Sequence, residues 1–313
     1  MKSLFVLLLL FSNTTNGQSI WMLDSVVSKN SLQETVRFLS QDSLNGRLTG
    51  TKGADIAATF ISAKFNQIEL NPIAGNDGYF DNYTAQYERK KIPAKNVAGT
   101  IPGKFSNDTV IIFSAHYDHI GQKDDLPFNK EYSYQDDIFN GANDNATGVA
   151  ALLEMARYYK VQNNNRYLLL FVAFSGEEMG MLGSTYLMNK SNPKIIKAVI
   201  NLEMLGRPER DNCFIVGFRT NTAKNALNNH LNKYQHPGVK NFFINDPYPD
   251  DNLARRSDHF PFAGKIKNAF TIMGSSPNDM YYHSIDDEYE TIDFDFLLKA
   301  TRNITLACEQ FTR

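Results

Sequence analysis

Short apolar runs alternate with amphipathic segments from residue 109 onward, and this alternation limits the possible folds more than any other feature of the chain. The apolar runs have the length of buried strands, and the segments between them repeat apolar residues at helical spacing. Strands are predicted over 109–114, 167–174 and 195–202, and helices over 147–159 and 182–189. Such alternation is typical of α/β proteins. We therefore expect three layers, in which helices flank a central, mostly parallel mixed sheet.

The rest of the chain adds elements to this sheet and shows no sign of a second domain. Further helices are predicted over 31–40, 54–67, 222–233 and 294–310, and further strands over 213–218, 241–244 and 269–273. No internal repeat or low-complexity linker interrupts this order. The 313 residues, 42% of them hydrophobic, suffice for one sizeable core. We expect a single domain over 18–313, with a long polar surface loop over 121–140.

The first 17 residues have the pattern of a signal peptide. Lys2 precedes an apolar run over 4–11, and small and polar residues follow it. This run is far shorter than the roughly 20 residues that cross a bilayer, and no later segment is long enough. The sequence therefore predicts a secreted or periplasmic protein without stable membrane insertion.

Charge and cysteine content narrow the function further. The chain has 32 basic and 34 acidic residues and no large basic cluster, so we expect no nucleic-acid binding. The two cysteines, Cys213 and Cys308, are too few for a disulfide framework. Both lie in apolar segments and are expected to be buried thiols, with a disulfide between them as the alternative.

The predicted strand over 109–114 leads into a His-x-Asp sequence, His116 and Asp118. Ligand sites in open α/β sheets form at the carboxyl ends of the strands. Residues two apart on a strand point to the same face, so Asp118 is placed to accept the second ring N–H of His116 and fix its tautomer. A solvated loop pair is the alternative.

Three further carboxylates lie at the ends of predicted elements. Asp144 occupies a turn before the helix over 147–159, where it is either a metal ligand or a helix cap. Glu177 and Glu178 follow a buried strand, and adjacent carboxylates repel unless a cation or a proton relieves them. Because adjacent side chains diverge, Glu178 can bind a metal while Glu177 acts as a general base. The alternative is an acidic first turn of a helix.

Glu203 and His283 complete a set of metal-binding residue types. Glu203 ends the strand over 195–202, and His283 lies beside Tyr282 in a polar loop after the strand over 269–273. A site for two zinc ions needs about five imidazole and carboxylate ligands, one of them shared. The chain offers five such candidates: His116, Asp144, Glu178, Glu203 and His283.

The remaining histidines and one more aspartate are given less weight. His119, His230, His236 and His259 are expected to be structural or exposed. Asp258 is either an acceptor for a metal ligand or the cap of a short helix.

Taken in order, these motifs resemble peptidase family M28, a family of zinc metallopeptidases, in its secreted aminopeptidase branch. The matching stretches are 114–118, 140–148, 174–183, 201–207, 257–262 and 282–283. The resemblance implies that Asp144 bridges two zinc ions, one also held by His116 and Glu203 and the other by Glu178 and His283.

The resemblance also assigns roles to three residues around the metals. It implies that Glu177 is the general base, that Asp118 orients His116, and that Tyr282 donates a hydrogen bond to the oxyanion of the intermediate. The chain departs from the family at Glu203, where many members carry aspartate. Its side chain is one methylene longer, so the metal there would be held differently.

The expected activity is hydrolysis of peptide bonds in peptide or protein substrates, with release of N-terminal residues. Three alternatives stay open. A glutaminyl-cyclase-like enzyme would share the Asp144, Glu178 and His283 type of ligand set around a single zinc. A carboxypeptidase would bind the substrate carboxylate through a cation such as Arg207, Arg255 or Arg256. A non-catalytic binding domain would have lost several ligands, whereas none is missing here.

Overall fold

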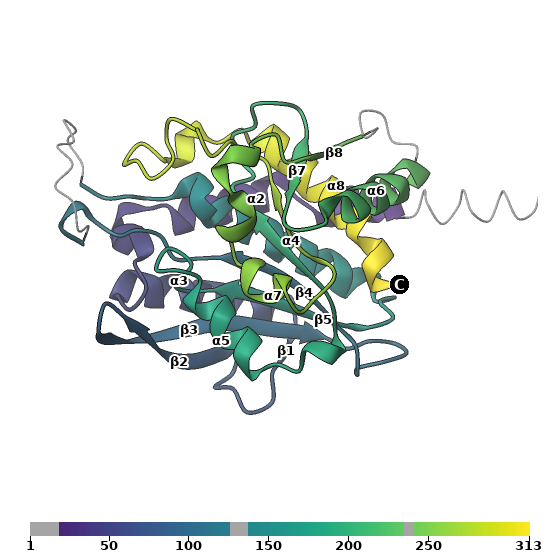
Figure 1. Cartoon of the computed structure of the whole chain (residues 1–313), viewed down its shortest axis with the longest axis horizontal. Helices are drawn as coiled ribbons and strands as arrows, with labels where there is room; N and C mark the ends of the chain where they lie inside the picture. The colour runs from purple at the N-terminus through teal and green to yellow at the C-terminus, as the bar shows by residue number, and fades with distance from the viewer. Residues whose placement is uncertain (1–18, 126–136, 235–240) are drawn as a thin grey trace, which may run out of the picture.

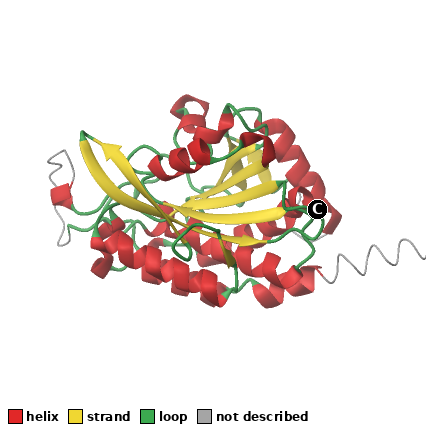
Figure 2. Ribbon diagram, turned by 90° about the horizontal axis from the view of Figure 1, so that it is seen from below, coloured by secondary structure: helices red, strands yellow, loops and turns green. Residues whose placement is uncertain are grey.

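The computed structural model describes residues 19–125, 137–234 and 241–313, and in this part of the chain a nine-stranded mixed sheet lies between helices (Figures 1 and 2). The strand order is β1-β3-β5-β4-β6-β9-β7-β8, with β2 paired to β3. The strands are β1 Asn71–Pro72, β2 Phe80–Tyr87, β3 Lys90–Ile101, β4 Val110–His116, β5 Leu168–Phe174, β6 Ile196–Glu203, β7 Cys213–Val216, β8 Phe243–Asn245 and β9 Ala269–Met273. This confirms the predicted α/β architecture with a mixed sheet.

The central strands β5, β4, β6 and β9 run parallel to one another. All residues of β4 are buried, which explains why the central strands are continuous apolar runs. In the register of the sheet, His116 at the end of β4 is opposite Phe174 of β5, and Glu203 at the end of β6 is opposite Met273 of β9. The carboxyl ends of these four strands therefore lie along one edge of the sheet.

Helices cover both faces of the sheet. The larger apolar cluster joins the sheet to α2, α3, α4, α6 and α8, and a smaller one joins the opposite face to α5 and α7. The helices are α2 Lys29–Leu39, α3 Lys52–Gln67, α4 Thr147–Gln162, α5 Leu182–Lys190, α6 Thr220–Leu231, α7 Phe260–Ala263 and α8 Phe294–Thr312. Residues 147–156 of α4 are all buried, so this helix is the centre of the larger cluster.

The sequence did not predict the hairpin of β2 and β3 at one border of the sheet (Figure 1). Its turn consists of Glu88 and Arg89, both with left-handed φ angles of 46° and 67°, and neither is a residue type that marks such a turn. Pro93 lies inside β3, where proline weakens the signal of a strand. The hairpin is stabilised by its partners in the sheet more than by local preference.

The structure confirms the prediction for the two cysteines and leaves the predictions for two segments untested. Cys213 and Cys308 are buried free thiols, as expected, and burial raises the pKa of both. The predicted signal peptide and the middle of the loop over 121–140 lie outside the described residues. Within the described ranges, no helix has both the length and the apolar character needed to traverse a bilayer.

Candidate metal centre and active site

The five candidate ligands lie together at the carboxyl edge of the sheet. His116 and Glu203 are the last residues of β4 and β6, and Glu178 lies in the turn between β5 and α5. Asp144 lies in the turn that enters α4, and His283 in the loop between β9 and α8. Because parallel strands end at the same edge, candidate ligands that are as far apart in sequence as His116 and His283 both contact Asp144.

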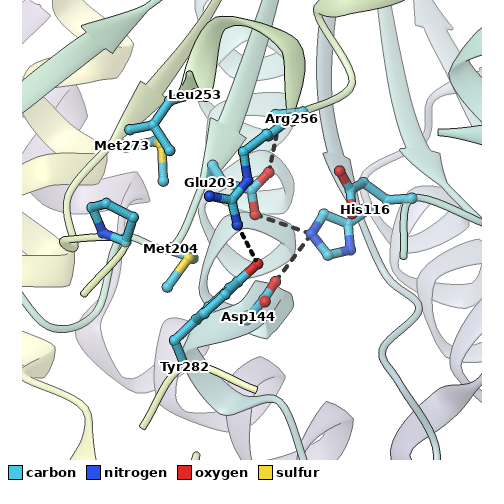
Figure 3. Close-up of a pocket in the computed structure, with 11 residues that line it drawn as sticks. His116, Asp144, Glu203, Met204, Leu253, Arg256, Met273 and Tyr282 are labelled. Atoms are coloured by element: carbon cyan, nitrogen blue, oxygen red, sulfur yellow. Dashed lines mark hydrogen bonds and ion pairs between the residues drawn. The ribbon is translucent and has the colours of Figure 1, made fainter. Parts of the chain in front are cut away.

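Asp144 is shared between two pairs of these residues. Its Oδ1 is 3.2 Å from His116 Nε2, which is also 3.0 Å from Glu203 Oε1 (Figure 3). Its Oδ2 is 3.3 Å from His283 Nε2, which is also 3.1 Å from Glu178 Oε2. The two oxygens of one carboxylate thus face two separate histidine–glutamate pairs.

Close packing brings the Asp144 turn to the end of β6. At Gly148, a Cβ atom would lie 2.6 Å from the carbonyl oxygen of Leu202, so only glycine permits this approach. The Asn145 side chain donates to that same oxygen at 2.9 Å and accepts from the N–H of Met204 at 3.1 Å. Asn145 therefore fixes the backbone on both sides of Glu203.

The donor atoms fit metal ions. His283 Nε2 is buried and makes no hydrogen bond, although two carboxylate oxygens lie within 3.3 Å of it. One ligand atom from each of His116, Asp144 and Glu178 lies within 4.8 Å of the others. Imidazole nitrogens and carboxylate oxygens at this spacing are the donor set that zinc prefers.

The histidines and carboxylates of the site shift the pKa values of one another. Although burial opposes the charge, the carboxylates of Glu178 and Asp144 raise the pKa of His283 to about 11. Burial likewise opposes ionisation of Asp144, but His116 and His283 hold its pKa well below the usual range. The two kinds of side chain therefore interact strongly, as groups that share a metal site are expected to do.

Glu177 and Glu178 diverge as the sequence predicts. Glu178 contacts His283 and His119, whereas Glu177 lines a cavity together with His116, Asp144 and Glu203. Burial raises the pKa of Glu177 well above its usual value. This arrangement separates the candidate ligand Glu178 from Glu177, the carboxylate expected to act in proton transfer.

His116 contacts both the backbone and the side chain of Asp118. Its Nδ1 lies 3.1 Å from the backbone carbonyl oxygen of Asp118 and 3.7 Å from the carboxylate. The carboxylate also accepts hydrogen bonds from the N–H of Glu177 at 3.2 Å and from the Thr49 hydroxyl at 3.0 Å. Asp118 is therefore placed next to the second ring nitrogen of His116, and its side chain also holds the turn that carries Glu177.

Sequence reasoning missed two residues of the site. The Thr49 hydroxyl accepts a hydrogen bond from the N–H of Gly176 at 2.8 Å and donates one to the Asp118 carboxylate. It therefore links the turn after β5 to the segment after β4. His119, expected to be structural or exposed, is fully buried with Nδ1 2.8 Å from Glu178 Oε1. Its position three residues after His116, beyond the end of the same strand, was the available signal.

Glu203 is held from the side opposite His116. Its Oε2 accepts a hydrogen bond from the Ser257 hydroxyl at 2.8 Å. The next residue, Asp258, is fully buried, and burial raises its pKa to about 7. Neither of its carboxylate oxygens has a hydrogen-bond partner among the described residues, and the short helix α7 has no side-chain cap. The structure therefore supports neither role considered for Asp258, as acceptor for a metal ligand or as helix cap.

Two of the remaining histidines take structural positions away from the candidate ligands, as predicted, and His236 lies outside the described residues. His259 is fully buried with Nδ1 2.7 Å from the Thr271 hydroxyl. His230 Nε2 lies 3.7 Å from a carboxylate oxygen of Glu309 on α8.

The cavity beside the ligands has one apolar wall and one polar rim (Figure 3). The apolar wall consists of Met204, Leu253, Met273 and Pro277. At the rim, the Tyr282 hydroxyl accepts a hydrogen bond from Arg256 Nη2 at 3.3 Å, and the Tyr282 ring stacks on His283 with centroids 4.0 Å apart.

Of the three arginines considered as a carboxylate site, only Arg256 lines this cavity in the described structure. Arg207 is paired with Asp279 and Asp287. The guanidinium of Arg255 lies 5.9 Å from the ring centroids of Phe218 and Phe260.

Comparison with known proteins identifies relatives in sequence. A family model described as peptidase family M28 matches residues 96–307. A probable leucine aminopeptidase of Trichophyton verrucosum is 29% identical over 217 residues, which cover 65% of this chain and 54% of that protein. The chain spans about half the length of the curated relatives it matches.

Solved structures share the fold. A zinc aminopeptidase from Bacillus subtilis, BSAP, has a TM-score of 0.69 at 18% identity, and the match covers 92% of this chain and 96% of the BSAP chain. A glutaminyl cyclase of Porphyromonas gingivalis has a TM-score of 0.68 at 18% identity, and the match covers 91% of this chain and 98% of the cyclase chain. At these identities the likeness establishes the fold alone.

Proposed function

Because the chain belongs to peptidase family M28, we propose that it is a secreted di-zinc aminopeptidase that releases N-terminal residues from peptides or proteins. The observation that carries the proposal is the Asp144 carboxylate, whose two oxygens face two separate ligand pairs. A carboxylate shared in this way would suit a site that holds two metal ions, as in two-metal hydrolases.

Each zinc would have three protein ligands in this proposal. His116 and Glu203 would hold one ion with Asp144, and Glu178 and His283 would hold the other with Asp144. Bound zinc supplies a Lewis acid that polarises the scissile carbonyl and makes a water molecule more acidic. The protein residues around the ligands supply proton transfer and hydrogen bonding.

Glu177 is the proposed general base. Its carboxylate lines the cavity beside the ligands, and its turn is fixed by the hydrogen bond from its own N–H to Asp118. Burial raises its pKa, and the negative charge of Glu178 adds to the effect. A carboxylate with a raised pKa is suited to take a proton from the attacking water and to return it to the leaving amine.

Tyr282 is the proposed donor to the carbonyl oxygen of the substrate. Its hydroxyl accepts from Arg256, which leaves the phenol proton free to donate. Burial raises the pKa of Tyr282, so the hydroxyl remains protonated near neutral pH. A donor fixed before the reaction stabilises charge that develops on the oxygen in the transition state.

Action at the amino terminus is supported by one residue of the cavity and by a sequence relative. Glu177, which is not a proposed ligand, lines the cavity and can accept a hydrogen bond from a substrate α-amine. The relative from Trichophyton verrucosum, named as a probable leucine aminopeptidase, supports the same choice. Arg256 is the residue that a carboxypeptidase would use instead.

Substrate and metal measurements on the purified protein test this proposal. We expect hydrolysis of amino-acid anilides, no hydrolysis of N-blocked peptides, and two zinc ions per chain. Cleavage of N-blocked peptides from the carboxyl end would support a carboxypeptidase. One firmly bound zinc per chain, together with cyclisation of an N-terminal glutamine, would support the cyclase alternative.

The Glu177→Gln variant tests the mechanism. The amide keeps the shape of the side chain but cannot accept a proton, so we expect kcat to fall by about 10²–10⁴-fold. Zinc content should stay at two per chain because Glu177 is not a proposed ligand. Peptidase activity at the wild-type level would exclude Glu177 as the base.

Export is part of the proposal and rests on the sequence of residues 1–17. Sequencing the N-terminus of the protein recovered from the medium or periplasm should give a chain that begins near Gln18. Recovery of the full-length chain in the cytoplasm alone would contradict export.

A further inference from the structure

We infer that Asp287 and Arg207 are positioning residues that hold the shared ligand Asp144 in place for both metal ions. The inference rests on the proposed metal site. Neither side chain is among the proposed ligands or lines the cavity. Asp287 contacts the backbone of the turn that carries Asp144, and Arg207 contacts Asp287.

Asp287 binds the backbone amides of this turn directly. Its Oδ1 accepts from the N–H of Asn143 at 2.8 Å, and its Oδ2 accepts from the N–H of Asp144 at 3.0 Å. Its own carbonyl oxygen accepts from the N–H of Ala142 at 2.9 Å. Three successive amides, those of the two residues before the shared ligand and of the ligand itself, thus donate to one fully buried residue.

Arg207 forms an ion pair with Asp287 and so holds its carboxylate in place. Its Nη1 donates to Asp287 Oδ1 at 2.6 Å, and its Nε donates to Asp279 Oδ2 at 2.5 Å. The guanidinium is one-tenth exposed, and Asp287 is fully buried. A buried carboxylate needs such a partner, because an uncompensated charge in the interior is strongly destabilising.

The pair connects the chain segments of three proposed ligands. Arg207 follows Glu203 by four residues, and Asp287 follows His283 by four residues. The Arg207 guanidinium also lies 5.1 Å from the ring centroid of Tyr281, two residues before His283. Displacement of this pair would therefore move Asp144 relative to the ligands on both sides of it.

A second buried arginine holds the other polar groups of the same turn. Arg47 is fully buried and donates to the carbonyl oxygens of Asn140 at 2.5 Å and Gly141 at 3.0 Å. Its Nε donates to the carbonyl oxygen of Tyr117 at 2.8 Å, next to His116. Carbonyls before the turn are thus held by a cation, and the amides within it by an anion.

Local structure cannot fix Asp144 without these partners. Asp144 and Asn145 have backbone angles outside the helical region, with φ/ψ of −107°/91° and −133°/41°. The amides of Asn143 and Asp144 therefore depend on an acceptor from elsewhere in the chain. A carboxylate is a stronger acceptor than a neutral group, which makes Asp287 suited to this position.

Two conservative variants test the inference through zinc affinity. In Asp287→Asn, one of the two carboxylate oxygens becomes an amide donor that faces a backbone N–H, and in Arg207→Lys the two-pronged contact with Asp279 and Asp287 is lost. We expect each variant to bind zinc about 10–100-fold more weakly in chelator competition. Both zinc sites should weaken together, because Asp144 belongs to both.

Three comparisons separate positioning from general stabilisation. Arg302→Lys is the matched control. Arg302 forms an ion pair of 2.9 Å with Asp24, and this pair lies outside the metal site. The control variant should therefore leave zinc affinity unchanged. The cobalt-substituted variants should show altered visible absorption bands, which report ligand geometry. The double variant should lose less affinity than the two single losses combined, as expected for residues that act as a unit.

The possible outcomes are distinct. A wild-type chain that binds fewer than two zinc ions would contradict the proposed function. A wild-type chain with two zinc ions, beside variants with lower metal-free Tm but unchanged zinc affinity and cobalt spectra, would overturn the inference. Weakening of only one zinc site would also overturn it, because the shared ligand would then not be the residue displaced.

Discussion

Three buried or partly buried histidines show how neighbours decide the role of one residue type. His116 and His283 face carboxylates on both sides of Asp144, an arrangement suited to metal ions. His259 is fully buried beside the Thr271 hydroxyl, and burial lowers its pKa to about 4. At neutral pH this third imidazole is therefore uncharged, and its role is structural.

Substitution of His259 should remove part of the acid sensitivity of the fold. Unfolded histidine binds a proton below about pH 6.5, whereas folded His259 binds one only near pH 4, so stability falls as the pH drops through this window. The full contribution is about 3 kcal/mol. His259→Asn, which can keep the contact with Thr271, should lose less stability between pH 7 and pH 4.5 than the wild type.

The measurement is urea unfolding of both proteins without metal at several pH values. The difference between them isolates His259 from other titrating groups, such as Asp258. If that difference is the same at pH 7 and pH 4.5, His259 is not the residue whose protonation destabilises the fold.

At the scale of elements, a buried carboxylate joins α2 to α4. Glu154 on α4 is 1% exposed and accepts hydrogen bonds from the N–H of Ser28 at 2.9 Å and the hydroxyl of Ser31 at 2.7 Å. Ser28 in turn caps α2 by accepting from the N–H of Ser31. A negative charge at the N-terminus of a helix also stabilises its dipole.

Replacement of Glu154 by alanine should cost about 1–3 kcal/mol of unfolding free energy, because a partly buried N–H and a hydroxyl lose their acceptor. Glu34→Ala, on the exposed face of α2, is the matched control and should change stability by less than about 0.5 kcal/mol. Urea denaturation curves measure both. Equal losses in the two variants would show that Glu154 contributes no more than a surface residue.

At the scale of the molecule, the parallel centre of the sheet brings the ligand segments together. β4, β5 and β6 end side by side, and the loops after β5 and β9 deliver Glu178 and His283 to the same edge. The unfolded chain cannot offer this arrangement, so metal binding should favour the folded state.

Zinc removal should therefore lower Tm. A ligand present at about 1,000 times its Kd stabilises the fold by about 4 kcal/mol, which corresponds to a shift of several degrees. We expect EDTA to reduce Tm in scanning calorimetry and added zinc to restore it. Asp144→Asn, which alters the ligand shared by both ions, should show little dependence on zinc. An unchanged Tm in EDTA, or an equal shift in this variant, would argue against a shared site.

The sequence alone allowed most elements and the candidate ligands to be predicted. The central strands are buried on both faces and α4 is buried over 147–156, so their apolar runs are long enough to recognise. Histidine and carboxylate residues at the ends of these apolar runs, such as His116 and Glu203, can be recognised because they follow a strand that the sequence already predicts. The hairpin of β2 and β3 escaped prediction because its turn and its proline carry no local strand signal.

Only the tertiary structure decided how the site residues are held. The contacts of Thr49 with Asp118, of His119 with Glu178 and of Asp287 with Asp144 join residues 69, 59 and 143 positions apart. No periodicity or motif records such contacts, because each depends on how whole elements pack. Local patterns therefore determined which residue types reach the edge of the sheet, and packing determined which atoms meet there.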